Sequence, residues 1–192
     1  MDESELLKKY NSLYLDIIMR YRDYIEEKEG LYIAELPKLV TPDDESVKLL
    51  ASSMKEKFPS YKYEENFAEA ANAAYSYVIS SIATVSLPIQ YWQKPADTIK
   101  HGAGEIFDKA VLLCSILVSL GCLPAKVAVS VGETVKSFAV YFENDSKIVS
   151  MDIEKGMATF ESMDKFLEYL GIREDSDVTA YEFNDKMYKD LA

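Results

Sequence analysis

The hydrophobic period of this sequence changes at Pro124, and that change limits the folds the chain can adopt. Before Pro124, apolar residues recur at three- and four-residue steps, which is typical of amphipathic helices. After it, Val127, Val129 and Val131 alternate with small residues, as in a half-buried strand. Helices followed by a meander of strands predict an α+β domain in which helices pack on an antiparallel sheet.

Four helices are predicted before Pro124. Their ranges are 3–29, 41–59, 64–82 and 106–120. The first would end at Gly30, and the second would begin at Thr41 as its N-cap. Between them, residues 31–40 contain Pro37 and are interpreted as an extended connector. The fourth helix is apolar around most of its circumference, which predicts that it lies at the centre of the core.

Three strands and one short helix are predicted after Pro124, followed by a tail from Arg173 that is left unassigned. The strands cover about residues 125–131, 135–143 and 147–153, with turns at Gly132-Glu133 and Asn144-Asp145, and the helix covers 162–170. We therefore expect a single domain over 1–192, with a helical extension at 1–40, a core at 64–153 and a C-terminal extension at 154–192. Residues 87–104 are expected to form an ordered loop.

The charge of the chain excludes some classes of partner. Lys and Arg number 21 against 33 Asp and Glu, and the net charge of −12 repels phosphate backbones and anionic membranes. No apolar run reaches the ~18 residues that a membrane span requires. The acidic start lacks the pattern of a signal peptide, so a cytoplasmic location is expected, with neither nucleic acid nor membrane as partner.

The residues able to perform catalysis are few. Cys114 and Cys122 are interpreted as buried free thiols, and His101 is the single histidine. No metal site and no cofactor are expected, because Glu105 and Asp108 more simply complement the positive end of the helix that begins beside them.

Residues 92–152 carry a recognisable order of motifs. It consists of Trp92, Pro95-Ala96-Asp97-Thr98-Ile99, Gly102-Ala103-Gly104-Glu105-Ile106-Phe107-Asp108, an apolar helix and Pro124-Ala125-Lys126-Val127. In order and spacing this resembles the transglutaminase-like superfamily, whose fold is papain-like. With the preceding helix, the resemblance covers residues 64–153.

The resemblance implies a cysteine at the start of the helix, a histidine on the second strand and an aspartate on the third. Here Ile106 stands at the cysteine position, Lys136 (or its neighbour Ser137) at the histidine position, and Asp152 at the aspartate position. An isoleucine side chain has no nucleophilic atom, so the resemblance implies a member without thiol chemistry. Lys136 and Asp152 are expected to form an ion pair that fills the former site.

Two functions follow from these expectations. The first is a scaffold or binding module that holds a peptide or protein in a groove lined by Trp92, Gly102, Gly104, Glu105 and Phe138. The alternative is a hydrolase or transferase with displaced chemistry, either metal-assisted at His101, Glu105 and Asp152 or based on a relocated thiol. The helix over 3–29 either packs on its own domain or forms a homodimer surface.

Overall fold

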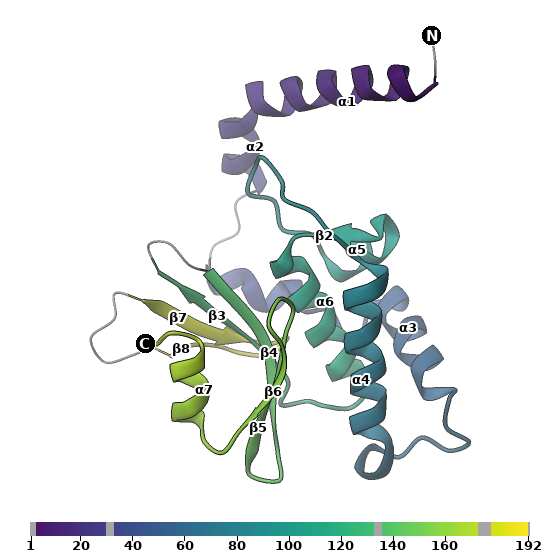
Figure 1. The fold of residues 1–192 in the computed structure, drawn as a ribbon, viewed down its shortest axis with the longest axis vertical. Helices are drawn as coiled ribbons and strands as arrows, with labels where there is room; N and C mark the ends of the chain where they lie inside the picture. Colours follow the sequence, from purple (N-terminus) through teal and green to yellow (C-terminus); the bar gives the residue numbers. More distant parts are fainter. Residues whose placement is uncertain (1–2, 30–32, 133–135, 173–177, 192) are drawn as a thin grey trace.

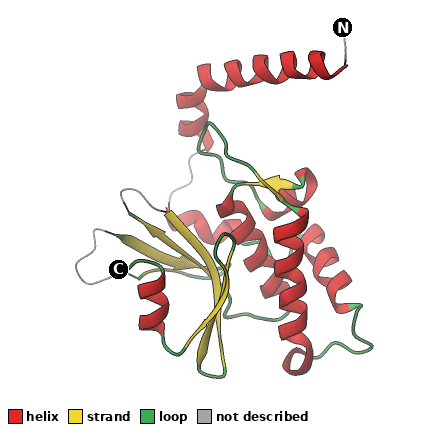
Figure 2. Cartoon of the chain, in the orientation of Figure 1, coloured by secondary structure: helices red, strands yellow, loops and turns green. Residues whose placement is uncertain are grey.

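The computed structural model describes residues 3–29, 33–132, 136–172 and 178–191, and it has the predicted α+β architecture (Figures 1 and 2). Its helices are α1 (Glu3–Arg20), α2 (Arg22–Glu29), α3 (Glu45–Lys55), α4 (Tyr63–Ser81), α5 (Pro95–His101), α6 (Ile106–Ser119) and α7 (Met163–Tyr169), with a 3₁₀ helix η1 (Ile33–Leu39).

A six-stranded antiparallel sheet forms the other half of the molecule. Its strands are β3 (Lys126–Val131), β4 (Lys136–Asn144), β5 (Lys147–Asp152), β6 (Gly156–Phe160), β7 (Thr179–Phe183) and β8 (Tyr188–Asp190). Their order is β6-β5-β4-β3-β7-β8. A separate parallel pair joins β1 (Ala83–Thr84) to β2 (Ala103–Gly104).

The core is divided into two layers by the sheet. On one face, α6 packs against β3 and β4, and α3 and α4 cover its other side. Leu112, Leu113 and Ile116 of α6 are fully buried, as expected for a central helix. On the opposite face, Phe166 of α7 packs against Ala139 and Tyr141 of β4.

The C-terminal extension belongs to this same sheet. β7 pairs with β3 along its whole length, so Val129 lies opposite Tyr181. The sequence analysis left this tail unassigned because its acidic residues obscured the two-residue period of Thr179–Phe183. Residues 173–177, Gly30, Glu133 and Val135, to which the predictions also extended, lie outside the described residues.

Four predictions of local structure require correction. The predicted helix 3–29 is broken at Tyr21 into α1 and α2, and residues predicted as an extended connector form η1 around Pro37. The predicted N-cap Thr41 is replaced by Asp44, whose side chain accepts from the Ser46 amide at 2.9 Å. Residues 95–101 form α5 within the predicted loop, with Pro95 in its first turn.

The expected packing of the helix over 3–29 on its own domain is wrong for α1 alone, because Glu26 of α2 accepts from the Gln90 amide of the body at 3.3 Å. The helix α1 projects away from the other helices and the sheet (Figure 1). Leu7, Leu13 and Ile17 are 61%, 53% and 44% exposed. Among the described residues, no helix is both long and apolar enough to cross a membrane.

Candidate functional site

The N-terminal end of α6 is capped by the side chains of Glu105 and Asp108. The Glu105 side chain accepts from the Asp108 amide, and the Asp108 carboxylate accepts from the Glu105 amide at 2.9 Å, which is a reciprocal capping box. Ile106, the first helical residue, is partly buried and packs against the main core. The helix end that would lower a thiol pKa therefore carries an aliphatic side chain flanked by two carboxylates.

Gln93 connects this helix end to the loop before it. Its backbone amide donates to Asp108 Oδ1 at 2.9 Å, and its Nε2 donates to the Ala103 carbonyl at 3.1 Å. Its Oε1 accepts from His101 Nδ1 at 2.9 Å. Burial raises the pKa of Asp108, against the lowering effect of the amides of Gln93 and Glu105. His101, the single histidine of the chain, is thus hydrogen-bonded to the side-chain amide of Gln93 and orients no nucleophile. The sequence analysis did not single out Gln93.

The predicted groove residues are only partly brought together. The Trp92 and Phe107 rings lie 5.1 Å apart between centroids, and Phe107 meets Phe138 at 5.6 Å. Trp92 and Phe138 thus belong to one aromatic cluster through Phe107. Gly102 ends α5 with a φ of 63°. An added Cβ on Gly104 would lie 3.0 Å from Asp108 Cβ, so its glycine permits the close approach of β2 to α6.

Asp152 lies on the opposite face of the sheet from α6. It pairs with Ala139, which belongs to the α7-side cluster, and its Oδ2 accepts from Tyr169 of α7 at 3.2 Å. Its Oδ1 accepts from the amides of Glu154 and Lys155 at 2.8 and 2.9 Å. Asp152 therefore stabilises the turn that follows β5.

The expected ion pair between Lys136 and Asp152 is wrong. Lys136 is exposed at the first position of β4 and lies two residues from Phe138, which packs on the α6 side. Alternation along β4 and β5 separates the two side chains onto opposite faces. The triad-equivalent positions are Ile106, Lys136 and Asp152. The structure does not bring Asp152 to Ile106. Phe138 is the β4 residue that contacts the first turn of α6 through Phe107.

A buried ion pair exists elsewhere on the α7 face. Lys126 Nζ lies 2.7 Å from Glu182 Oε1, and Glu182 is 2% exposed. The Tyr141 hydroxyl donates to the second oxygen of this carboxylate, and burial together with Glu182 raises the pKa of Tyr141. Sequence reasoning missed this pair because β7 was not predicted.

Ser137 contacts Lys155, which is a different lysine from its sequence neighbour Lys136. Lys155 Nζ donates to Ser137 Oγ at 3.1 Å and lies 4.9 Å from the centre of the Tyr169 ring. Both contacts are on the α7 face, and they fasten the β5–β6 turn to β4.

Neither thiol is placed for catalysis. Cys114 and Cys122 are both fully buried. Burial raises the pKa of each, so both thiols are protonated at neutral pH. Cys114 lies two turns into α6, away from its positive end.

The residues of the metal-assisted alternative are also separated. His101 is bound by Gln93, Glu105 caps α6, and Asp152 faces α7. Across the described ranges, no cluster of three or more His, Cys, Asp or Glu is arranged to hold a metal ion.

Lys109 is a buried cation that the sequence analysis did not single out. It is 2% exposed, and its Nζ donates to the Ile82 carbonyl at 2.9 Å and to Thr84 Oγ1 at 3.0 Å. Burial lowers its pKa. These bonds tie α6 to the end of α4 and to β1, and they give Lys109 a structural role.

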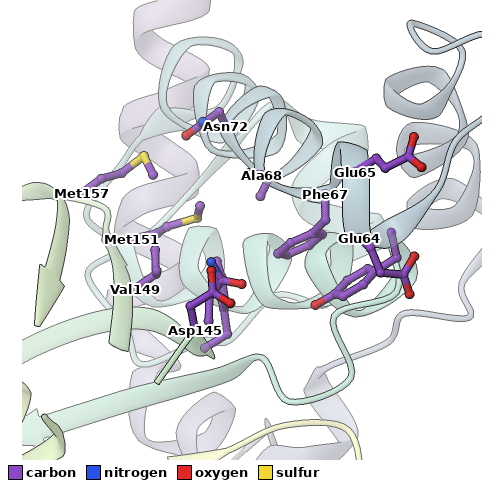
Figure 3. Close-up of a pocket in the computed structure, with 13 residues that line it drawn as sticks. Glu64, Glu65, Phe67, Ala68, Asn72, Asp145, Val149, Met151 and Met157 are labelled. Carbon is purple, nitrogen blue, oxygen red and sulfur yellow. The ribbon is translucent and has the colours of Figure 1, made fainter. Parts of the chain in front are cut away.

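A cavity of about 400 Å³ lies between α4 and the β4–β6 side of the sheet. We call it the α4–β6 groove, defined by Phe67, Phe142, Val149, Met151 and Met157 on its apolar walls and by Glu64, Glu65 and Asp145 at its polar edge. Figure 3 shows the methionines and Val149 across from the α4 residues, with Glu64 and Glu65 on the α4 side and Asp145 on the side of Val149. A cavity of this size accommodates a few apolar side chains.

The polar edge of the groove is negative. Glu65 is paired with Lys62 at 2.8 Å, with both side chains more than half exposed. Glu64 and Asp145 have no ion-pair partner within the part of the chain that the structure describes. Because water screens exposed charges, these two acids act mainly by favouring a cationic ligand and disfavouring an anionic one.

Comparison with known proteins identifies the fold. No family model and no curated protein matches the chain. Among solved structures, Legionella pneumophila LapG matches with a TM-score of 0.53 and 15% identity, over 84% of this chain and 88% of LapG. The calcium-bound LapG matches with a TM-score of 0.53 and 16% identity over the same shares. The EGTA-treated LapG matches with a TM-score of 0.50 and 15% identity, over 84% of this chain and 91% of that chain.

The chain has a transglutaminase-like fold. The predicted fold class is thereby confirmed, with the buried α6 packed on an antiparallel sheet. At this identity the likeness concerns the transglutaminase-like fold alone, so the function depends on the residues of this chain.

Proposed function

We propose that this protein is a catalytically inactive transglutaminase-like domain that binds a peptide segment of a partner protein. The observation that carries the inactivity is Ile106 at the first position of α6, inside a closed capping box. Thiol catalysis needs a thiolate there and an imidazole beside it. Phe107 and Phe138 fill the adjoining space, and both thiols of the chain are buried elsewhere.

The binding role is supported by the α4–β6 groove rather than by the aromatic cluster at Trp92. Its volume of about 400 Å³ accommodates a few apolar side chains, and two of its wall residues are methionines, which adapt to ligands of different shape. Because Glu64 and Asp145 lie at its edge, the favoured ligand is a peptide with a Leu, Met or Phe anchor next to Lys or Arg.

The cytoplasmic location expected from the sequence remains part of this proposal. So does the absence of nucleic-acid and anionic-membrane partners, which is supported by the net charge of −12.

The proposal is tested by calorimetric titration of the full chain with a ten-residue peptide in which one leucine is flanked by lysines. We expect micromolar binding that weakens as salt is added, and at least tenfold weaker binding to Glu64→Lys/Asp145→Lys. Asp23→Lys/Glu27→Lys, which changes two exposed acids of α2, is the matched charge control and should change binding little. Equal binding of a peptide with glutamates in place of the lysines would contradict the proposal, as would equal loss in the control.

A second measurement tests the inactivity. The purified protein, supplied with casein and a labelled primary amine, should show neither peptide cleavage nor amine incorporation above the rate without protein. Turnover that is abolished by iodoacetamide would overturn the proposal.

A further inference from the structure

The two edges of the six-stranded sheet are protected to different degrees. β8, at one edge, is three residues long, carries Lys189 and Asp190, and lies against η1. β6, at the other edge, is five residues long and has the sequence Gly-Met-Ala-Thr-Phe, with no charge and no proline. Soluble proteins usually shorten, charge, kink or cover an edge strand, because its unpaired amides and carbonyls can pair with another chain. β8 follows this rule and β6 does not.

The backbone of β6 is open on the side away from β5. Its register with β5 runs without a bulge from Gly156, opposite Asp152, to Phe160, opposite Ile148. Among the residues that the structure describes, no hydrogen bond joins the backbone of Met157–Phe160 to any group outside β5. In an antiparallel edge strand, every second residue turns its N–H and C=O away from the sheet. These groups of β6 are therefore available to an added strand.

The open edge adjoins the α4–β6 groove. Met157 is 44% exposed, forms part of the groove wall and lies opposite Met151, which packs on the α6 side of the sheet. Figure 1 shows β6 between α4 and α7, which lie on the two faces of the sheet. A strand added beside β6 would lie about 4.8 Å from it. Every second side chain of that strand would then be a cross-strand neighbour of Met157 on the groove side.

We infer that the bound peptide adds to the sheet as a strand along the open edge of β6, with its apolar anchor on the groove side beside Met157. This inference rests on the proposed function and specifies the conformation in which the peptide binds. Main-chain hydrogen bonds would supply affinity for an extended segment of about five residues, the length of β6. The alternate side chains that face the groove would supply specificity.

The charges at the two ends of β6 favour a cationic peptide over a second copy of this chain. Glu154 precedes the strand and Glu161 follows it, and both are exposed. Glu161 pairs with Lys147, but its side chain is 79% exposed and stays accessible. Lys155 is hydrogen-bonded to Ser137 on the α7 face. A Lys or Arg at each end of the added segment would meet a carboxylate, whereas two copies would each bring a net charge of −12.

The first test is a scan of backbone methylation through the ten-residue peptide in which one leucine is flanked by lysines. Each peptide of the scan carries one N-methyl group, which removes one amide donor, and each is titrated into the full chain. We expect binding weakened by about tenfold for methylation at alternate residues near the leucine and little change at the residues between them. Equal effects at successive residues, or no effect at any, would overturn the inference.

Hydrogen exchange followed by mass spectrometry locates the peptide on the chain. The unmodified peptide should slow exchange in the fragment that contains residues 156–160, because the unpaired amides of β6 become hydrogen-bonded. Exchange in residues 188–190 of β8, the protected edge, should not change and serves as the control.

The outcomes separate this inference from the proposed function. Binding of the peptide without protection of β6 would overturn the inference and leave the proposed function standing. Absence of binding would overturn both. Protection of β6 that rises with protein concentration when no peptide is present would assign the edge to a second copy, and it would overturn the inference.

Discussion

Replacing Lys126 by methionine should destabilise the protein strongly, because it leaves a buried carboxylate without its counter-ion. Glu182 is 2% exposed, and among the described residues it would retain the Tyr141 hydroxyl as its hydrogen-bond donor. Removing one partner of a fully buried pair costs about 3–5 kcal/mol. The Lys126 side chain is 24% exposed, so water would partly compensate, and we expect a loss of about 2–3 kcal/mol.

For a domain of this length, such a loss corresponds to a fall in melting temperature of about 4–12 °C. The assay is thermal and urea unfolding of Lys126→Met beside Lys147→Met. Lys147 pairs with Glu161 at 3.1 Å, but their side chains are 50% and 79% exposed, so that control should change stability by no more than about 1 kcal/mol.

A double variant separates the charge effect from lost packing. In Lys126→Met/Glu182→Gln the unpaired charge is gone and the amide can still accept from Tyr141, so most of the lost stability should return. The reasoning is refuted if Lys126→Met unfolds like Lys147→Met, or if the double variant is less stable than Lys126→Met.

Three further predictions concern the first turn of α6, the neighbouring Gly104, and Tyr169 beside Asp152. Ile106→Cys should yield a thiol that is only a few per cent thiolate at pH 7, and the variant should have no peptidase or amine-transfer activity. Alkylation of this thiol as fast at pH 6 as at pH 9 would contradict the prediction. Gly104→Ala should cost about 1–3 kcal/mol in urea unfolding, because the new Cβ meets Asp108 Cβ at 3.0 Å; an unchanged midpoint would argue against that contact. Burial and Asp152 raise the pKa of Tyr169 to about 12, so the folded state favours the neutral phenol. The stability that this raised pKa contributes is complete below pH 10 and is lost as the pH rises toward 12. Tyr169→Phe should therefore flatten the fall of melting temperature between pH 10 and 12. An unchanged slope would show that Tyr169 is not the source of that fall.

The fold was accessible from the sequence where periodicity is strong. The predicted helix 106–120 corresponds to α6 (Ile106–Ser119), and the strand at 147–153 corresponds to β5 (Lys147–Asp152). In both, burial imposes a regular apolar pattern, and a glycine, a proline or a turn marks the end.

The candidate site was harder to predict, because it depends on which face each strand residue occupies. Spacing along the chain placed Asp152 beside Lys136, but the register sets Asp152 opposite Ala139, on the α7 side. A shift of one residue reverses the facing of a strand side chain, and a motif alignment does not fix the register to one residue.

The long-range contacts were missed for a related reason. Lys126 and Glu182 are 56 residues apart in sequence and meet because β7 lies next to β3. No local pattern near Lys126 indicates that neighbour. The α4–β6 groove likewise requires α4 and the β5–β6 hairpin to be placed relative to each other.

The reactivity of the two native thiols tests most directly the claim that this transglutaminase-like fold has no thiol chemistry. With iodoacetamide at pH 7, we expect neither Cys114 nor Cys122 to be modified in the native protein over the time in which both are fully modified in guanidinium chloride, as counted by mass spectrometry. Rapid modification of one native thiol, faster than that of a free cysteine at the same pH, would contradict the account.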